Sequence, residues 1–111
     1  MPEKSMYSLT ESGEKEFQRL MHELSKKLIH MFLDFNAVIV NLENMPKEEQ
    51  RECLDVIEKN TDILMKYLEE NLKLKEKAEN IPPTGMAVLH QQITSAKAIQ
   101  VWIDDLKNTT W

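Results

Sequence analysis

Apolar residues recur every three or four positions over most of this chain, which predicts a largely helical protein. The first such stripe starts at Phe17 and runs to Phe35 without proline or glycine. Two interpretations remain open: one long helix over residues 10–44, or a break near residues 34–36, where aspartate and asparagine favour turns. We favour the break, because residues 37–40 are apolar on all sides, as in a short and deeply buried helix.

Prolines delimit two longer helical patterns that follow. Pro46 suits the first position of a helix, and the pattern behind it runs to about Ala78, with acidic residues at its start and lysines near its end, as the helix dipole favours. At roughly 45 Å, such a helix has the length of a coiled coil. Residues 80–83 (Asn-Ile-Pro-Pro) predict a stop and a turn, and Thr84 is the expected cap of a last helix. The short connection favours an antiparallel pair.

Two paired helices of this kind have more apolar surface than they can cover in each other, so we expect a homodimer. The alternative is a self-sufficient bundle of three or four helices. Asn60 and Asn71 lie at or beside the apolar seam, where a buried asparagine specifies the register of a coiled coil. The candidate residues of the dimer seam are Ile57, Leu64, Tyr67, Leu74, Ile93, Ile99, Trp102, Ile103 and Leu106.

Charge and cysteine content narrow the function classes. The formal net charge is −5 and 30% of residues are charged, which argues against nucleic-acid binding by this chain alone, because such binding depends on neutralising phosphates. A lone Cys53 excludes an internal disulfide and fits a reducing compartment. No apolar run is long enough to span a bilayer, and we expect a cytoplasmic protein that does not associate with membranes.

The sequence offers little that predicts catalysis. Its carboxylates lie at helix starts and on solvated faces, and it has neither a glycine-rich phosphate loop nor a nucleophile motif. His22, His30 and His90 have no histidine or cysteine three or four residues away, the spacing a helical metal site needs. We therefore expect no enzyme activity, no cofactor and no metal. Tyr67 and Trp102 are candidates to line a pocket for a flat aromatic ligand, with ordinary core packing as the alternative.

The beginning of the chain contains the most specific pattern. A short β-prone run over residues 6–9 leads to Thr10, a good helix cap, followed by Gly13 and the aromatic Phe17. This order, Tyr-x-Leu-Thr-x-x-Gly with an aromatic four residues on, resembles the end of the winged helix in bacterial PadR-like transcription regulators. The junction over residues 42–49 and the ending over residues 101–106 are similar to the helical C-terminal domain of the same family.

The resemblance implies that residues 1–9 are the remnant of a wing strand and that residues 10–111 form a helical dimerisation and effector domain. The implied fold is all-α, with a linking helix and a long antiparallel hairpin like a coiled coil. In the family, DNA is bound through an N-terminal winged helix that this sequence lacks, and small phenolic ligands or partners modulate the dimer. The alternatives are a stand-alone helical interaction module resembling an anti-activator, and a sensor of a small aromatic effector.

Overall fold

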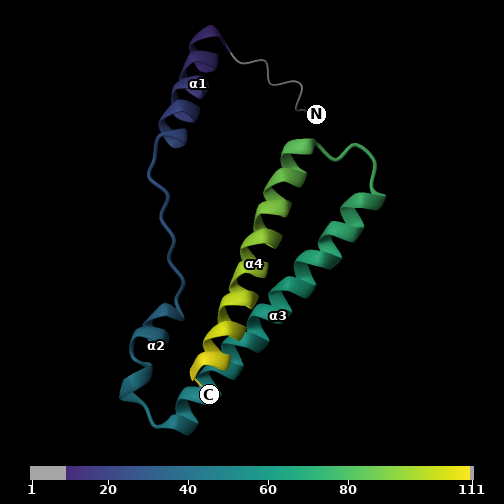
Figure 1. The fold of residues 1–111 in the computed structure, drawn as a ribbon. Helices are drawn as coiled ribbons and strands as arrows, with labels where there is room; N and C mark the ends of the chain where they lie inside the picture. The colour runs from purple at the N-terminus through teal and green to yellow at the C-terminus, as the bar shows by residue number, and fades with distance from the viewer. Residues whose placement is uncertain (1–9, 111) are drawn as a thin grey trace. The chain divides into compact units, whose positions relative to one another are not determined.

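The computed structural model describes residues 10–110, and all regular elements in that range are helical (Figure 1). The helices are α1 (Glu11–Ser25), α2 (Asn36–Val40), the 3-10 helix η2 (Leu42–Asn44), α3 (Lys47–Lys77) and α4 (Pro83–Thr110). The predicted all-α fold is confirmed. The wing strand expected before Thr10 lies outside the described residues. The chain divides into two compact units, Met1–Phe32 and Leu33–Trp111.

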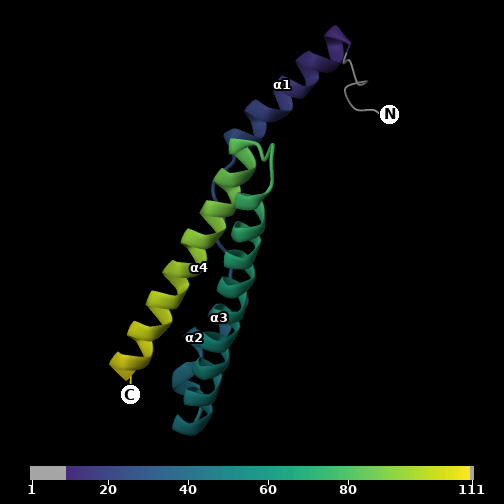
Figure 2. The ribbon, with the colours of Figure 1, turned by 90° about the vertical axis from the view of Figure 1, so that its right-hand side faces the viewer.

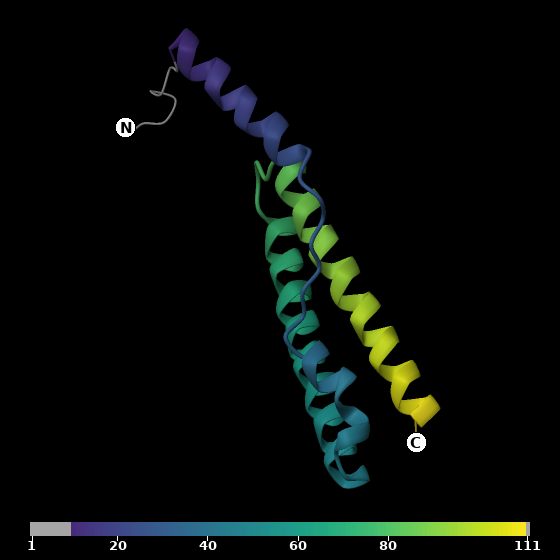
Figure 3. The same cartoon turned by 90° about the vertical axis from the view of Figure 1, so that its left-hand side faces the viewer.

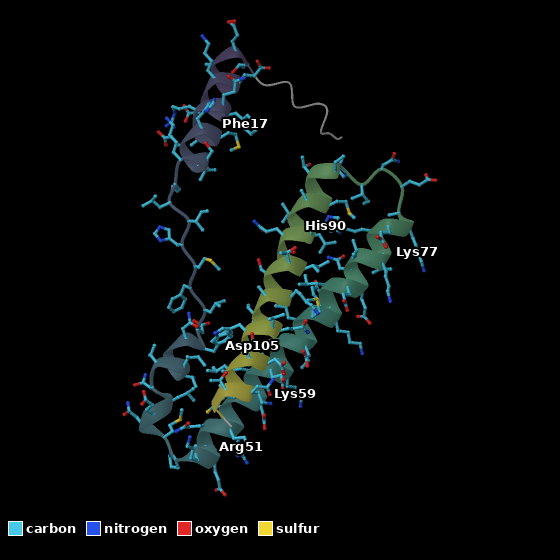
Figure 4. All side chains as sticks on the ribbon, viewed as in Figure 1. Phe17, Arg51, Lys59, Lys77, His90 and Asp105 are labelled. Carbon is cyan, nitrogen blue, oxygen red and sulfur yellow. The ribbon has the colours of Figure 1, made fainter. Side chains whose placement is uncertain are left out.

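Helices α3 and α4 run antiparallel and form the hairpin that dominates the second unit, as the sequence predicted (Figures 1 and 2). Figure 4 labels Lys59 and Lys77 on α3, and His90 and Asp105 on α4. Side chains between the two helices form two apolar clusters. The first contains Leu42, Leu54, Ile57 and Ile103, and the second contains Met65, Leu68, Leu89 and Ala96.

The ends of the hairpin helices differ slightly from the prediction. Pro46 is the cap residue before α3, not its first helical residue. Next to Pro46, the side-chain amide of Gln50 donates a hydrogen bond to the Met45 carbonyl at 2.7 Å. Helix α4 begins at Pro83, so the prediction of Thr84 as its cap is wrong. Proline suits a first helical position because its missing N–H would have no partner there. Asn80 adopts a φ of 65°, a left-handed conformation that asparagine tolerates, in the turn between the helices.

The predicted break in the first helical region is confirmed, and α2 begins at Asn36 behind a turn at residues 34–35, but the break is much longer than predicted. Helix α1 ends at Ser25, and residues 28–33 have neither helix nor turn. Leu28, Met31 and Phe32, which the periodicity placed on one helical stripe, are each more than 80% exposed. A helical stripe persists in water mainly when another surface packs against it, so periodicity alone does not keep these residues helical.

The helix expected over residues 37–40 is short, but it is not deeply buried. No residue of α2 is buried, and Val40 is 79% exposed. Val38 and Ile39 pack at the edge of the first apolar cluster, and the buried Leu42 of η2 is the main anchor of the segment. Figures 2 and 3 show α2 at the end of the hairpin where α3 begins and α4 ends.

Helix α1 starts as predicted. The Thr10 hydroxyl accepts a hydrogen bond from the Gly13 amide at 3.0 Å, which satisfies one of the orphan donors of the first turn. On the surface of the helix, Arg19 pairs with Glu16 and Glu23. These pairs lower the pKa of the Glu16 carboxyl and raise the pKa of the Arg19 guanidinium.

Candidate interaction surface

Helix α3 has two apolar stripes, only one of which is used by the hairpin. The second stripe lies on one flank of the first: Leu64, Tyr67 and Leu74 are 44%, 65% and 69% exposed. An amphipathic helix normally has a single apolar stripe, so a second, exposed stripe is an unusual feature of α3. The stripe buried against α4 consists of Leu54, Ile57, Thr61, Met65 and Leu68.

The second stripe borders a groove of about 490 Å³ between α3 and α4. Leu64 and Tyr67 line it from α3, Ile99 lines it from α4, and the buried Leu68 and Ala96 also contribute to the lining. The interior of the groove is therefore apolar. Its size suits either one face of a helix or a small flat ligand.

The rest of the groove lining is polar but uncharged. This polar part consists of Asn71 from α3 and Gln91, Gln92 and Ser95 from α4. Leu33, which is apolar, also lines the groove. None of the described residues that line the groove carries a charge. A partner in this groove would therefore bind through apolar contacts and neutral hydrogen bonds.

The opposite flank of the hairpin is charged, and it is held by contacts between the two helices. Lys107 Nζ lies 2.6 Å from Asp55 Oδ1 and 2.8 Å from Glu58 Oε1, and the Gln100 amide donates to Asp62 Oδ1 at 2.9 Å. At 3.6 residues per turn, these three carboxylates lie on the other side of the buried stripe from the groove. The carboxylate of Asp55, and then that of Glu58, raise the pKa of Lys107.

Residues 33–45 cover the groove side of the hairpin, but only near the C-terminal end of α4. The Phe35 ring stacks on Trp102, which shares a helix face with Ile99 and Ser95. Val38 lies beside Cys53 and Val56, where it lines a hollow of about 220 Å³. One side of the hairpin is thus covered at one end and open at the other.

The structure separates the predicted seam residues into three groups. Ile57 and Ile103 are buried inside a single chain, and Ile103 is only 1% exposed. Leu64, Tyr67, Leu74 and Trp102 are exposed. The half-buried members of the set are Ile93, Ile99 and Leu106.

The structure does not bring the two predicted pocket aromatics into one groove. Tyr67 lines the groove, whereas Trp102 is outside its lining and stacks on Phe35. The polar lining residues were missed by the sequence reasoning. The sequence does contain a signal for them: the uncharged pair Gln91-Gln92 and then Ser95, all on the last predicted helix.

Neither asparagine considered for the seam is fully buried. Asn60 is exposed, and Asn71 is half-buried where it lines the groove. Two polar residues of α3 are buried, Gln50 and Thr61, and the Thr61 hydroxyl donates to the Ile57 carbonyl at 2.8 Å. Thr61 therefore satisfies its hydroxyl within its own helix and leaves the seam to apolar contacts.

The described residues contain no group of three or more histidine, cysteine, aspartate or glutamate side chains placed to hold a metal ion. Over the same part of the chain, no helix combines the length and apolar character that a bilayer crossing requires. Comparisons of the chain with protein-family models, with curated proteins and with solved structures gave no match.

Proposed function

We propose that this chain is the dimerisation and effector-sensing domain of a PadR-like transcription regulator. DNA binding would belong to the winged helix of the complete regulator. The hairpin would hold two copies together, and α1 would link each copy to its DNA-binding part. A change in how the helices of the two copies cross would then change the spacing of the DNA-binding parts.

The observation that carries this proposal is the apolar side of the hairpin that residues 33–45 leave uncovered. Leu64, Tyr67 and Leu74 are more exposed than the core of a monomeric bundle would leave them. A stripe of this kind on one helix, next to a groove without charged lining, is typical of a surface that pairs with another helix. The opposite flank, with its carboxylates and lysines, is suited to solvent.

Sedimentation equilibrium at tens of micromolar tests the dimer. We expect a two-chain species for the unmodified protein, and a loss of dimer for Leu64→Glu, which places a charge in the groove. The matched control is Lys66→Glu, a change on the exposed surface of the same helix, which should leave the dimer intact. A protein that remains monomeric across this concentration range would refute the homodimer.

A small flat aromatic ligand is the second candidate occupant of the groove. Tyr67 offers an aromatic wall, and the Asn71 and Gln92 amides offer hydrogen-bonding groups at the same groove. Titration of simple phenols by isothermal calorimetry tests this function. We expect binding that Tyr67→Ala abolishes and Trp102→Phe leaves unchanged, because Trp102 lies outside the groove lining. Equal loss in both variants, or no binding by any phenol, would count against this site.

A further inference from the structure

The second apolar stripe of α3 extends well beyond the groove. Val56 and Ile63 continue it toward the start of the helix, and they are 51% and 57% exposed. From Val56 through Ile63 and Tyr67 to Leu74, exposed apolar residues recur at steps of seven, four and seven residues. A stripe that keeps this heptad spacing over about five turns is typical of one helix of a coiled coil.

Charged residues follow the edge of this stripe that lies away from the groove, and their sign changes along the helix. Glu48 and Glu52 lie near the start of α3, and Lys73 and Lys77 lie near its end. All four residues are exposed. At 3.6 residues per turn, their side chains fall on one side of α3, next to Ile63. The edge is therefore acidic at one end and basic at the other.

This distribution of charge favours an antiparallel second copy of α3 as the partner of the stripe. In antiparallel copies, the acidic start of each helix meets the basic end of the other, whereas parallel copies place like-charged ends side by side. Opposite charges at the edges of a helix pair favour one orientation over the other. The antiparallel pair also brings Lys59 near Lys66 of the other copy, but the attractive contacts at the two ends outnumber this repulsion.

The shape of the stripe agrees with the same orientation. The hollow of about 220 Å³ lined by Val38, Cys53 and Val56 lies near the start of α3. A two-fold axis near residues 61–62 places Val56 opposite Tyr67 of the other copy. The Tyr67 side chain, which is 65% exposed, would then pack at the hollow of its partner. The covered end of each hairpin would thus meet the open end of the other.

We propose that two copies of α3 pair antiparallel along the second stripe, about a two-fold axis near residues 61–62. This inference rests on the proposed homodimer and names its contact surface and its orientation. In this register Glu52 lies opposite Lys73 of the other copy, and Asn60 lies beside Ile63. Because the contact is isologous, each such pair occurs twice, and the exposed apolar residues of both stripes are buried together.

Cross-linking between chains tests the orientation, and the native cysteine provides one of the two probes. In the proposed register, Cys53 lies opposite Glu70, an exposed residue that interrupts the apolar stripe. The unmodified chain is mixed with a Cys53→Ser, Glu70→Cys chain, unfolded and refolded with it, and treated with a short bismaleimide. Each chain carries one cysteine, so every covalent product joins two chains. We expect a covalent heterodimer in the mixture and little covalent dimer from either chain alone.

The matched control is a Cys53→Ser, Glu69→Cys chain. It moves the new cysteine to a neighbouring exposed residue, about 100° around the helix, and should give little heterodimer. Equal yields from the two variants would contradict the proposed register. Covalent dimers from either the unmodified chain or the Glu70→Cys chain alone would show a parallel pair and overturn the orientation.

Sedimentation equilibrium separates failure of this inference from failure of the proposed homodimer. A dimer in sedimentation that gives no heterodimer on cross-linking would overturn the α3 contact, while the homodimer would stand. A monomer in sedimentation would overturn both. A dimer in sedimentation together with the expected cross-link would support both.

Reversal of charge provides a second readout. Glu52→Lys or Lys73→Glu alone should raise the dimer dissociation constant about fivefold or more, because each change creates repulsion at both ends of the pair. A chain with both changes should return to within about threefold of the unmodified protein. Residues 52 and 73 lie about 31 Å apart along one helix, too far to interact within a chain.

Glu69→Lys is the control for charge reversal, since Glu69 lies away from the proposed contact, and it should leave the dissociation constant unchanged. Circular dichroism of each variant checks that the helices remain folded. A double variant that stays as weak as the single variants would contradict the antiparallel pairing.

Discussion

The Phe35 ring stacks on the Trp102 indole, with centroids 5.7 Å apart and ring planes 17° apart. The contact joins the residue before α2 to α4, and it lies beside the apolar cluster that contains Leu42 and Ile103. Residues 33–45 are held to the hairpin by this stack and by the anchor at Leu42.

Removal of the stack should loosen the segment around α2. We expect Phe35→Ala to lower the free energy of unfolding by about 2 kcal/mol, because a half-buried aromatic side chain and its stacking partner are lost. Urea unfolding followed by Trp102 fluorescence, in a Trp111→Phe background, measures the effect. Phe32→Ala is the matched control, since Phe32 is 81% exposed. Equal effects in the two variants would show that the stack contributes nothing.

The core of the hairpin should be sensitive to loss of volume. Leu54 and Ile103 are 0% and 1% exposed, and we expect alanine at either position to cost about 3 kcal/mol, through lost burial and the cavity left behind. Thermal and urea unfolding measure this loss. Val40→Ala, at a position that is 79% exposed, should change stability by less than about 0.5 kcal/mol. A small loss at Leu54 would mean that the two helices separate easily.

The buried hydroxyl of Thr61 should be dispensable for folding. We expect Thr61→Val to be neutral or to stabilise by about 0.5–1 kcal/mol, because valine fills the same space and the Ile57 carbonyl keeps its helical backbone partner. The urea midpoint of the variant against the unmodified chain is the measurement. Destabilisation larger than about 1 kcal/mol would show that the hydrogen bond from Thr61 to Ile57 matters beyond its own helix.

The contacts of Lys107 with Asp55 and Glu58 should contribute stability that depends on pH. These carboxylates raise the pKa of Lys107 in the folded state, so the contribution is complete below the unfolded pKa of about 10.4 and is lost as the pH rises through the folded value. We expect Lys107→Met to cost on the order of 0.5 kcal/mol at pH 7. The gap between variant and unmodified protein should narrow as the pH rises past the unfolded pKa of Lys107.

Urea unfolding at pH 7, 9 and 11 measures this gap. Lys66→Met, which removes an exposed lysine of α3, should show no comparable change across the same range. A gap that stays constant to pH 11 would mean that packing of the Lys107 chain, and not its charge, accounts for the loss.

Local signals were sufficient to predict most of the helices. Thr10 caps α1 and Pro46 precedes α3, because caps and prolines act through the backbone of a few neighbouring residues. The stop predicted at residues 80–83 follows the end of α3 at Lys77, and Pro83 is already the first residue of α4. The antiparallel pairing of α3 and α4 followed from their spacing and short connection. The end of α1 at Ser25 could not be predicted in this way. The apolar period continues past Ser25, and whether a stripe stays helical depends on what packs against it.

The sequence by itself determined that this chain is helical, that two long helices pair, and that more apolar surface exists than one pair needs. Only the tertiary structure decided which stripe of α3 faces α4, and therefore that Ile57 is buried while Tyr67 lines an open groove. It also decided that Trp102 stacks on Phe35 and takes no part in that groove. The physical reason is that periodicity measures only the spacing of apolar residues along one helix. The choice between two adjacent stripes depends on the rotation at which a second helix packs.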